Sequence, residues 1–239
     1  AEDTEVLRLG FSSKTPIHSH LGMILQEHPE LQEKYGLKLE LRAYDSGKTQ
    51  GKDVAEQRLD AWFSCAVPAV HMLGSRPDAK IIASVGELGR IAILGGESID
   101  SFSALKNKRV GLVKGSTPDL YWKSKWFREL KKAKMVYLRT DELEEALETG
   151  AVDAIVSWDP WIAEWQGTHS EWTVLRESEF HSVLNVGTMW ALGDTTTTPR
   201  AKRLVSLMTD AMTILRENQS YYDQKAAEMG DWSVETVEA

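Results

Sequence analysis

Two stretches of the chain repeat one pattern about a hundred residues apart. The first copy consists of Arg8-Leu9-Gly10 and, later, Leu59-Asp60-Ala61-Trp62-Phe63-Ser64; the second consists of Arg109-Val110-Gly111 and, later, Val152-Asp153-Ala154-Ile155-Val156-Ser157. In each copy an apolar strand leads through a small-residue loop and a helical stretch to a second strand that begins at hydrophobe-Asp-Ala. The repeat predicts two similar α/β lobes. Such a protein has one obvious ligand site, the crevice where the C-terminal ends of the strands of both lobes meet.

The rest of the chain alternates strands with helices. Strands are expected at 6–11, 37–44, 61–64, 80–85, 90–94, 109–113, 135–138, 154–158, 172–175 and 184–192. Helices are expected at 16–33, 54–59, 68–73, 118–131, 142–148, 199–217 and 220–229. This alternation predicts parallel-rich sheets with helices on both faces. Crossings near 86–90 and 186–190 predict a two-strand hinge, with lobe I at 1–89 plus 188–239 and lobe II at 90–187.

Composition narrows the function class. The 239 residues are 42% hydrophobic and 27% charged, which is typical of a globular protein with a sizeable core. A net charge of -8 argues against nucleic acid as a partner. No apolar run approaches the ~18 residues that span a bilayer. The single cysteine, Cys65, excludes an internal disulfide and a cysteine-rich metal site, so we expect no metal and no cofactor.

The chain begins at Ala1 with an acidic Glu2-Asp3 segment. Cleavage of a signal peptide after a small residue leaves such a start, although a shortened chain would begin in the same way. We therefore expect an exported, periplasmic protein, and we expect a monomer.

The turn Lys114-Gly115-Ser116-Thr117-Pro118-Asp119 carries the strongest local chemistry. Gly115 allows a tight turn after a strand, Ser116 or Thr117 can cap a helix, and Pro118 suits its first position. The backbone N–H groups of such a helix start bind anions. A well-capped helix without a ligand is the alternative.

The first lobe has a matching turn that ends at Pro16. Its residues Ser12, Ser13 and Lys14 are candidates for a charge-assisted grip on the same anion, although Lys14 could equally be a solvated loop lysine. His18 and His20 lie two residues apart on the following helix, so they do not share a face and would make a poor metal pair. We expect them at the helix cap or on the surface.

Trp158-Asp159-Pro160 follows the last strand of the repeat. Trp158 ends that strand, so it could enclose a ligand and donate one hydrogen bond from its indole N–H. Asp159 could instead cap the next helix. Trp161 and Trp165 have helical spacing, which favours packing within the lobe.

Four runs carry a resemblance to a known family: Tyr44 to Gly47, Arg58 to Ala69, Lys108 to Thr117 and Ala151 to Pro160. In that order, over nearly the whole chain, they resemble the taurine, alkanesulfonate and nitrate type of substrate-binding protein of ABC importers. The resemblance implies the type II periplasmic binding fold, a ligand between the lobes and a permease in the membrane as partner. It implies ligand contacts at Ser12, Ser13, Cys65, Ala66, Val67, Gly89, Arg90, Ser116, Thr117, Trp158 and Asp159.

The chain also departs from that family. A taurine binder should hold the ammonium with carboxylates near the crossings, but Ala92 and Thr188 stand at those places, and Arg90 adds a cation. An unsubstituted sulfonate, a phosphonate or a larger carboxylate therefore fits better than taurine.

Two alternatives use the same scaffold: a binder of a thiamin-precursor pyrimidine, and a desulfinase-like enzyme. By resemblance, a desulfinase would carry its nucleophile in the first loop, where this chain has Ser12 to Thr15. Cys65 lacks an obvious histidine base, which a catalytic thiol needs, so we expect no enzymatic activity. A receptor that signals through a membrane partner is not separable from a transport protein by sequence.

Overall fold

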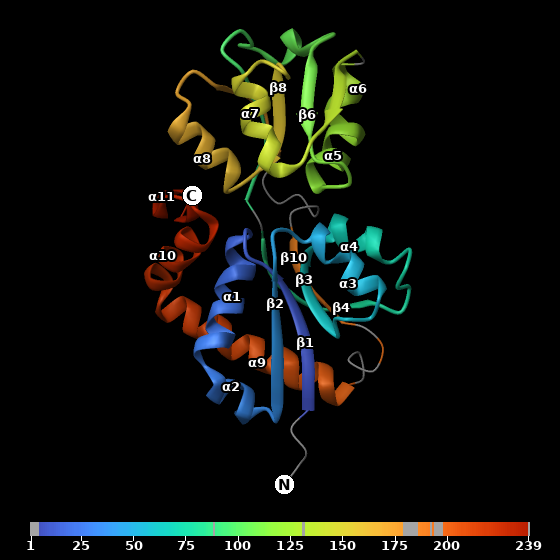
Figure 1. Cartoon of the computed structure of the whole chain (residues 1–239), viewed down its shortest axis with the longest axis vertical. Coiled ribbons are helices and arrows are strands. Elements are labelled where there is room, and N and C mark those ends of the chain that lie inside the picture. Colours follow the sequence, from blue (N-terminus) through green and yellow to red (C-terminus); the bar gives the residue numbers. More distant parts are fainter. Residues whose placement is uncertain are drawn as a thin grey trace. The chain divides into compact units, whose positions relative to one another are not determined.

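The computed structural model describes residues 5–87, 89–130, 132–178, 186–191, 193 and 198–238. The chain divides into two compact units: unit 1 comprises Ala1–Glu87 with Val186–Glu238, and unit 2 comprises Leu88–Asn185. The boundaries predicted from the sequence, after residues 89 and 187, each lie two residues beyond those of these units. Each unit is an α/β structure built on one five-stranded sheet (Figure 1).

The sheet of unit 1 has the strand order β2-β1-β3-β10-β4. Its strands are β1 (Glu5–Ser12), β2 (Leu37–Tyr44), β3 (Ala61–Cys65), β4 (Lys80–Glu87) and β10 (Val186–Ala191). Its helices are α1 (Pro16–Glu27), α2 (Pro29–Lys34), α3 (Gly51–Ala55), α4 (Ala66–Met72), α9 (Thr198–Glu217), α10 (Gln219–Gly230) and α11 (Val234–Glu238), with a 3-10 turn η1 (Lys48–Gln50). β1 is parallel to β2 and β3, whereas β10 is antiparallel to β3 and β4. The C-terminal ends of β1 to β4 therefore share one edge, and β10 begins there.

The sheet of unit 2 has the corresponding order β7-β6-β8-β5-β9. Its strands are β5 (Ile91–Gly95), β6 (Arg109–Leu112), β7 (Lys134–Tyr137), β8 (Ala154–Trp158) and β9 (Thr173–Glu177). Its helices are α5 (Thr117–Tyr121), α6 (Phe127–Leu130), α7 (Leu143–Glu148) and α8 (Trp161–Thr168), with short turns η2 (Phe102–Leu105), η3 (Trp122–Trp126) and η4 (Thr140–Glu142). β5 is antiparallel to its neighbours β8 and β9, and β6 is parallel to β7 and β8. In each unit the antiparallel strand is the first strand after a crossing.

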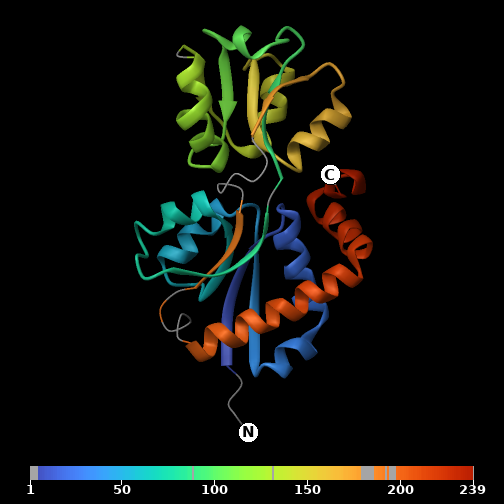
Figure 2. The same ribbon diagram turned by 180° about the vertical axis from the view of Figure 1, so that it is seen from behind.

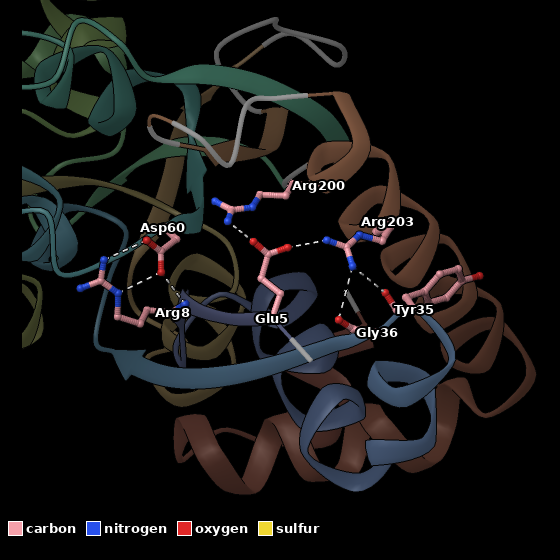
Figure 3. Close-up of polar contacts among 7 residues, drawn as sticks. All are labelled: Glu5, Arg8, Tyr35, Gly36, Asp60, Arg200 and Arg203. Carbon is pink, nitrogen blue, oxygen red and sulfur yellow. Dashed lines mark hydrogen bonds and ion pairs between the residues drawn. The ribbon is translucent and has the colours of Figure 1, made fainter. Parts of the chain in front are cut away.

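The repeated sequence forms the same contact in both units. In unit 1 the Arg8 backbone N–H and Nε both donate to Oδ2 of Asp60, at 2.8 and 2.9 Å, and the Asp60 N–H donates back to the Arg8 carbonyl at 2.8 Å (Figure 3). In unit 2 the Arg109 N–H and Nε donate to Oδ2 of Asp153 at 2.7 and 3.1 Å, and the Asp153 N–H returns a bond at 2.8 Å. We call this arrangement a clasp. It fixes the register of the central strand against the next strand in each sheet.

A second polar cluster ties the last long helix of unit 1 to its sheet. Glu5, at the start of β1, forms ion pairs with Arg200 and Arg203 of α9 (Figure 3). The Arg203 guanidinium also donates to the carbonyls of Tyr35 and Gly36, at 3.5 and 3.4 Å. α9 runs across the sheet of unit 1 (Figure 2), and this cluster anchors its first turns.

Both sheets have helices on two faces. In unit 1, α1, α9 and α10 cover one face with a large apolar core, and α3 and α4 cover the other with a smaller one around Trp62. In unit 2, the segment from α5 to α6 covers one face, and α7 and α8 cover the other. Within the described part of the chain, no helix combines the length and the apolar character that crossing a membrane requires.

Three expected helices differ from the structure. The helix expected at 16–33 is two helices, α1 and α2, which are separated at His28 because Pro29 follows it. The helix expected at 54–59 is α3, which ends at Ala55, because Gln57 takes a left-handed backbone (φ +57°) that no helix continues through. The helix expected at 118–131 is interrupted by η3, a π-helical turn. Its five-residue spacing brings Tyr121 and Trp126 together in the core, with ring centroids 4.8 Å apart. Residue 131 lies outside the described residues, as do 184, 185 and 192 of the last expected strand.

The prediction that His18 and His20 lie at a cap or on the surface is wrong. Both are buried in α1, His18 fully and His20 at 4% exposure. His18 stacks on Phe63 and has no hydrogen-bond partner among the described residues, and burial lowers its pKa to about 3. Nε2 of His20 lies 3.0 Å from Oδ1 of Asp223 in α10. The sequence near α1 does not reveal this burial, because the covering helix lies far along the chain.

Candidate functional site

The topology gathers most of the predicted site residues at one edge of each sheet. In unit 2 the strands β6, β7 and β8 end where β5 begins. That edge brings together Arg90, Ser116, Thr117, Trp158 and Asp159. In unit 1 the corresponding edge holds Ser12, Ser13, Lys14, Cys65 and Ala66. Both crossings of the chain also leave the sheets at these edges.

The Ser116-Thr117 turn is satisfied by its own side chains. The Ser116 hydroxyl donates to the Val113 carbonyl at 2.7 Å and accepts from the Asp119 N–H at 3.3 Å. The Asp119 carboxylate in turn accepts from the Gly115 N–H at 2.9 Å. Ser116 and Thr117 are each 7% exposed. The geometry therefore favours the capped-helix interpretation of this turn, and contact of these two residues with a ligand stays a prediction.

Asp119 also organises a cationic cluster that joins Lys114 of this turn to Lys123 and Tyr137, two residues that the sequence did not single out. Its carboxylate lies 2.9 Å from Nζ of Lys123, and the Tyr137 hydroxyl donates to it at 3.4 Å. Nζ of Lys123 and Nζ of Lys114 lie 5.2 and 5.7 Å from the centroid of the Tyr137 ring. The only signal in the sequence was that Lys114 and Tyr137 come at or just after the ends of two neighbouring strands.

Arg90 forms a third clasp, at the crossing into unit 2. Its backbone N–H donates to Asp159 Oδ2 at 3.1 Å, the Asp159 N–H donates to the Arg90 carbonyl at 3.1 Å, and Nε lies 3.2 Å from the carboxylate. The guanidinium also contacts the side chains of Glu177 and Gln166. Arg90 thus joins β5, β8, β9 and α8 within unit 2. A ligand anion at Arg90 would compete with two carboxylates.

Asp159 is the more buried partner of this clasp. Its side chain is 14% exposed, and burial raises its pKa even though Arg90 acts in the opposite direction. A Cβ at position 89 would lie 2.6 Å from Cβ of Asp159, so Gly89 is needed for this close approach. The sequence offered helix capping as the alternative role of Asp159, and the structure shows both contacts: the carboxylate is bound to Arg90 and also accepts from the Ala163 backbone N–H in the first turn of α8.

Trp158 is half-buried at the end of β8. It packs against the apolar clusters on both faces of the sheet of unit 2. Trp165 is fully buried and pairs with Trp161, with ring centroids 5.7 Å apart, as expected for packing within the unit. Trp158 therefore has a structural role that any variant will also disturb.

The edge of unit 1 combines hydroxyl groups with the start of a longer helix. Ser12 is fully buried and accepts from the Thr15 hydroxyl at 2.9 Å; the Ser13 hydroxyl donates to the Tyr44 carbonyl at 3.1 Å. Thr15 precedes α1 without a side-chain capping bond from the described residues, and the first turn contains no acidic residue. This start of α1 therefore retains the positive end of the helix dipole. Lys14 beside it is half-buried.

Cys65 and Ala66 lie where β3 meets α4. Burial raises the pKa of the Cys65 thiol to about 12, so it stays protonated near neutral pH. Such a thiol is a poor nucleophile. The described residues also contain no group of three or more His, Cys, Asp or Glu side chains placed to hold a metal ion.

A cavity of about 590 Å³ opens at the opposite edge of unit 2, where β8 begins. Its lining includes the carboxylates of Glu97, Glu148, Asp153 and Glu171. Such a lining repels anions. We therefore do not assign the predicted ligand to this cavity.

Comparison with solved structures identifies the fold. The alkanesulfonate-binding protein SsuA from Xanthomonas axonopodis pv. citri, bound to MOPS, matches with a TM-score of 0.77 and 17% identity over 100% of this chain and 83% of that chain. A Candida albicans protein described as exhibiting the generic periplasmic binding protein fold matches with a TM-score of 0.78 and 12% identity over 98% and 79% of the two chains. The desulfinase DszB in complex with biphenyl-2-sulfinic acid matches with a TM-score of 0.72 and 14% identity over 98% and 83%.

These likenesses confirm the expected type II periplasmic binding fold, and at these identities they establish the fold alone. No family model matches the sequence. No curated protein matches it either.

Proposed function

We propose that this chain is the substrate-binding protein of an ABC importer and that it captures a small organic anion, with sulfonates as the leading class. The observation that carries the proposal is the full-length likeness to a sulfonate-binding protein holding MOPS. In this proposal the ligand is held by residues of the strand-end edges, where the predicted site residues gather. The chain is then a monomeric periplasmic protein, and its macromolecular partner is a permease in the membrane.

The two edges differ in what they offer an anion. The start of α1, with Ser13 and Lys14 beside it, supplies helix-dipole and ammonium charge from unit 1. In unit 2, Arg90 and Asp159 hold the end of β8 through their clasp, so their role is to position Trp158 at the edge. Trp158 supplies an aromatic surface for the carbon skeleton of the ligand.

Two features support binding rather than catalysis. The first loop contains Ser12 to Thr15 and no cysteine. The thiol of Cys65 is protonated near neutral pH, because burial raises its pKa to about 12. A desulfinase-like activity would need a nucleophile with a positioned base, and Cys65 does not meet that requirement.

A thermal-shift screen tests the proposal. The panel contains methanesulfonate, MOPS, taurine, methylphosphonate, benzoate, nitrate and hydroxymethylpyrimidine. A ligand that binds the folded state raises the melting temperature by mass action, and at a hundredfold excess over Kd the stabilisation is about 2.7 kcal/mol. We expect MOPS or methanesulfonate to give the largest rise and taurine a smaller one. If only the pyrimidine raises the melting temperature, the anion assignment is wrong and the thiamin-precursor alternative replaces it.

A further inference from the structure

Two lysines at the strand-end edge of unit 2 share one aromatic ring. Lys114 follows β6 and Lys123 lies in η3, and their Nζ atoms are 5.7 and 5.2 Å from the centroid of the Tyr137 ring. We propose that Lys114, Lys123 and Tyr137 form the subsite for the acidic head group of an organic anion, with the carbon atoms next to that group lying against the ring. This inference rests on the proposed function and names the part of the site that recognises the charge.

The subsite is organised before any ligand arrives. Asp119 is 4% exposed, and its carboxylate is fixed by the Gly115 N–H at 2.9 Å. That carboxylate holds Nζ of Lys123 at 2.9 Å and accepts a hydrogen bond from the Tyr137 hydroxyl at 3.4 Å. A lysine on a flexible stem loses rotamer freedom when it grips a ligand. Here the fixed carboxylate has already placed Lys123, so less of that cost falls on binding.

The same groups remain accessible. The Lys123 side chain is 42% exposed, Tyr137 is 41% exposed, and Lys114 is exposed. An ammonium group over a ring face is attracted by the ring and still has N–H groups to donate. A tetrahedral oxyanion has several oxygens and can accept from both lysines at once. The chemistry therefore fits an organic sulfonate or phosphonate, and it disfavours a cationic head group.

The other charged features of this edge fit an anion less well. The Arg90 guanidinium contacts two carboxylates, those of Asp159 and Glu177, whereas Nζ of Lys123 contacts one, that of Asp119. The start of α5 is filled by the Asp119 carboxylate and by the hydroxyl of Ser116. The lysines are grouped with an exposed aromatic ring, which is what a ligand with a charged end and a carbon skeleton requires.

Calorimetric titration with MOPS tests the subsite. We expect Lys114→Gln and Lys123→Gln to weaken MOPS binding roughly tenfold to a hundredfold, as the loss of a charged hydrogen bond does, and Lys114→Arg to retain most of the affinity. Tyr137→Phe keeps the ring and should bind within a few-fold of the parent, whereas Tyr137→Leu should bind clearly more weakly. Lys106→Gln is the matched control, because Lys106 is exposed at the other edge of unit 2 and should bind as the parent does.

The outcomes separate this inference from the proposed function. Unchanged melting temperatures without MOPS establish that the lysine variants are folded, which their exposed positions favour. If the parent binds MOPS and both glutamine variants bind it as tightly, the subsite is overturned while the proposed function stands. If the parent binds no sulfonate of the panel, the proposed function fails and the subsite fails with it.

Discussion

Removing Asp159 should distinguish two roles for Arg90, because the two roles predict changes of opposite sign. If Arg90 grips the ligand directly, Asp159→Ala frees its guanidinium from a competing carboxylate and raises affinity for an anion. If Arg90 acts through the clasp, Asp159→Ala loosens the end of β8 and lowers affinity, as Arg90→Ala also does. We expect the second result, because the backbone groups of both residues take part in the clasp.

The structure sets the size of the effect. The Asp159 carboxylate is 14% exposed and accepts a backbone N–H at 3.1 Å and the guanidinium Nε at about the same distance. Hydrogen bonds to charged groups contribute about 1.5–3 kcal/mol, and the burial that raises the pKa of Asp159 offsets part of this. We expect Asp159→Ala to lower the free energy of unfolding by about 1–2 kcal/mol and to weaken ligand binding by roughly threefold to tenfold.

Urea unfolding and calorimetric titration with MOPS measure the two quantities. Arg90→Ala should weaken MOPS binding by a similar factor. The double variant should lose little more affinity than either single variant, because both substitutions break the same clasp. Arg139→Ala is the control, since this arginine in the same unit is 72% exposed and its ion pairs, with Asp141 and Glu142, lie at the surface. Tighter MOPS binding by Asp159→Ala, together with loss of binding by Arg90→Ala, would refute the positioning role and make Arg90 a direct ligand contact.

Three further outcomes are expected. Asp153→Asn should lower the free energy of unfolding, measured in urea, by about 1 kcal/mol, whereas Asp141→Asn, which breaks an exposed ion pair, should lower it by less than about 0.5 kcal/mol. Because Arg109 lowers the pKa of Asp153, the stabilisation by Asp153 is present above its unfolded-state pKa and is lost as the pH falls through its folded-state pKa. Burial lowers the pKa of His18 to about 3, so its contribution to stability is present well above its unfolded-state pKa and is lost as the pH falls through and below that value. The parent should therefore lose about 1.6 kcal/mol between pH 6.5 and pH 5 that His18→Leu does not lose. Trp158→Ala should weaken MOPS binding by about 1–3 kcal/mol and also lower the melting temperature, and an unchanged Kd would restrict Trp158 to packing.

The sequence predicted the parts of the fold that local pattern encodes. The strands at 37–44 and 154–158 have the expected bounds, because alternating or continuous apolar runs end there at polar turns. Arg8 and Asp60 in the first copy of the repeat form the same clasp as Arg109 and Asp153 in the second copy. The sequence pattern did not predict η3, because the choice between a regular α-helical turn and a π-helical turn depends on packing in the core of unit 2.

The sequence predicted where the candidate site residues lie, but it did not predict which of their charged side chains form ion pairs. Strand ends are visible in a sequence, so the edge that holds Ser116, Trp158 and Arg90 could be found. Which charged groups neutralise one another depends on contacts between distant segments, as the sequence separation of 69 between Arg90 and Asp159 illustrates. For the same reason Arg90 read as a lone cation in the sequence, although the structure surrounds it with carboxylates.

The three clasps among the described residues lie at different places in the two sheets. Two of them, at Arg8 and Arg109, lie toward the starts of strands β3 and β8, away from the edge that holds the predicted site. The third, at Arg90, lies at the end of β8, beside a crossing. No counterpart of it occurs among the described residues of unit 1, where Cys65 ends β3 and Ala66 follows it, and neither supplies a carboxylate. The Arg90 clasp is therefore specific to unit 2, where it ties the start of β5 to the end of β8.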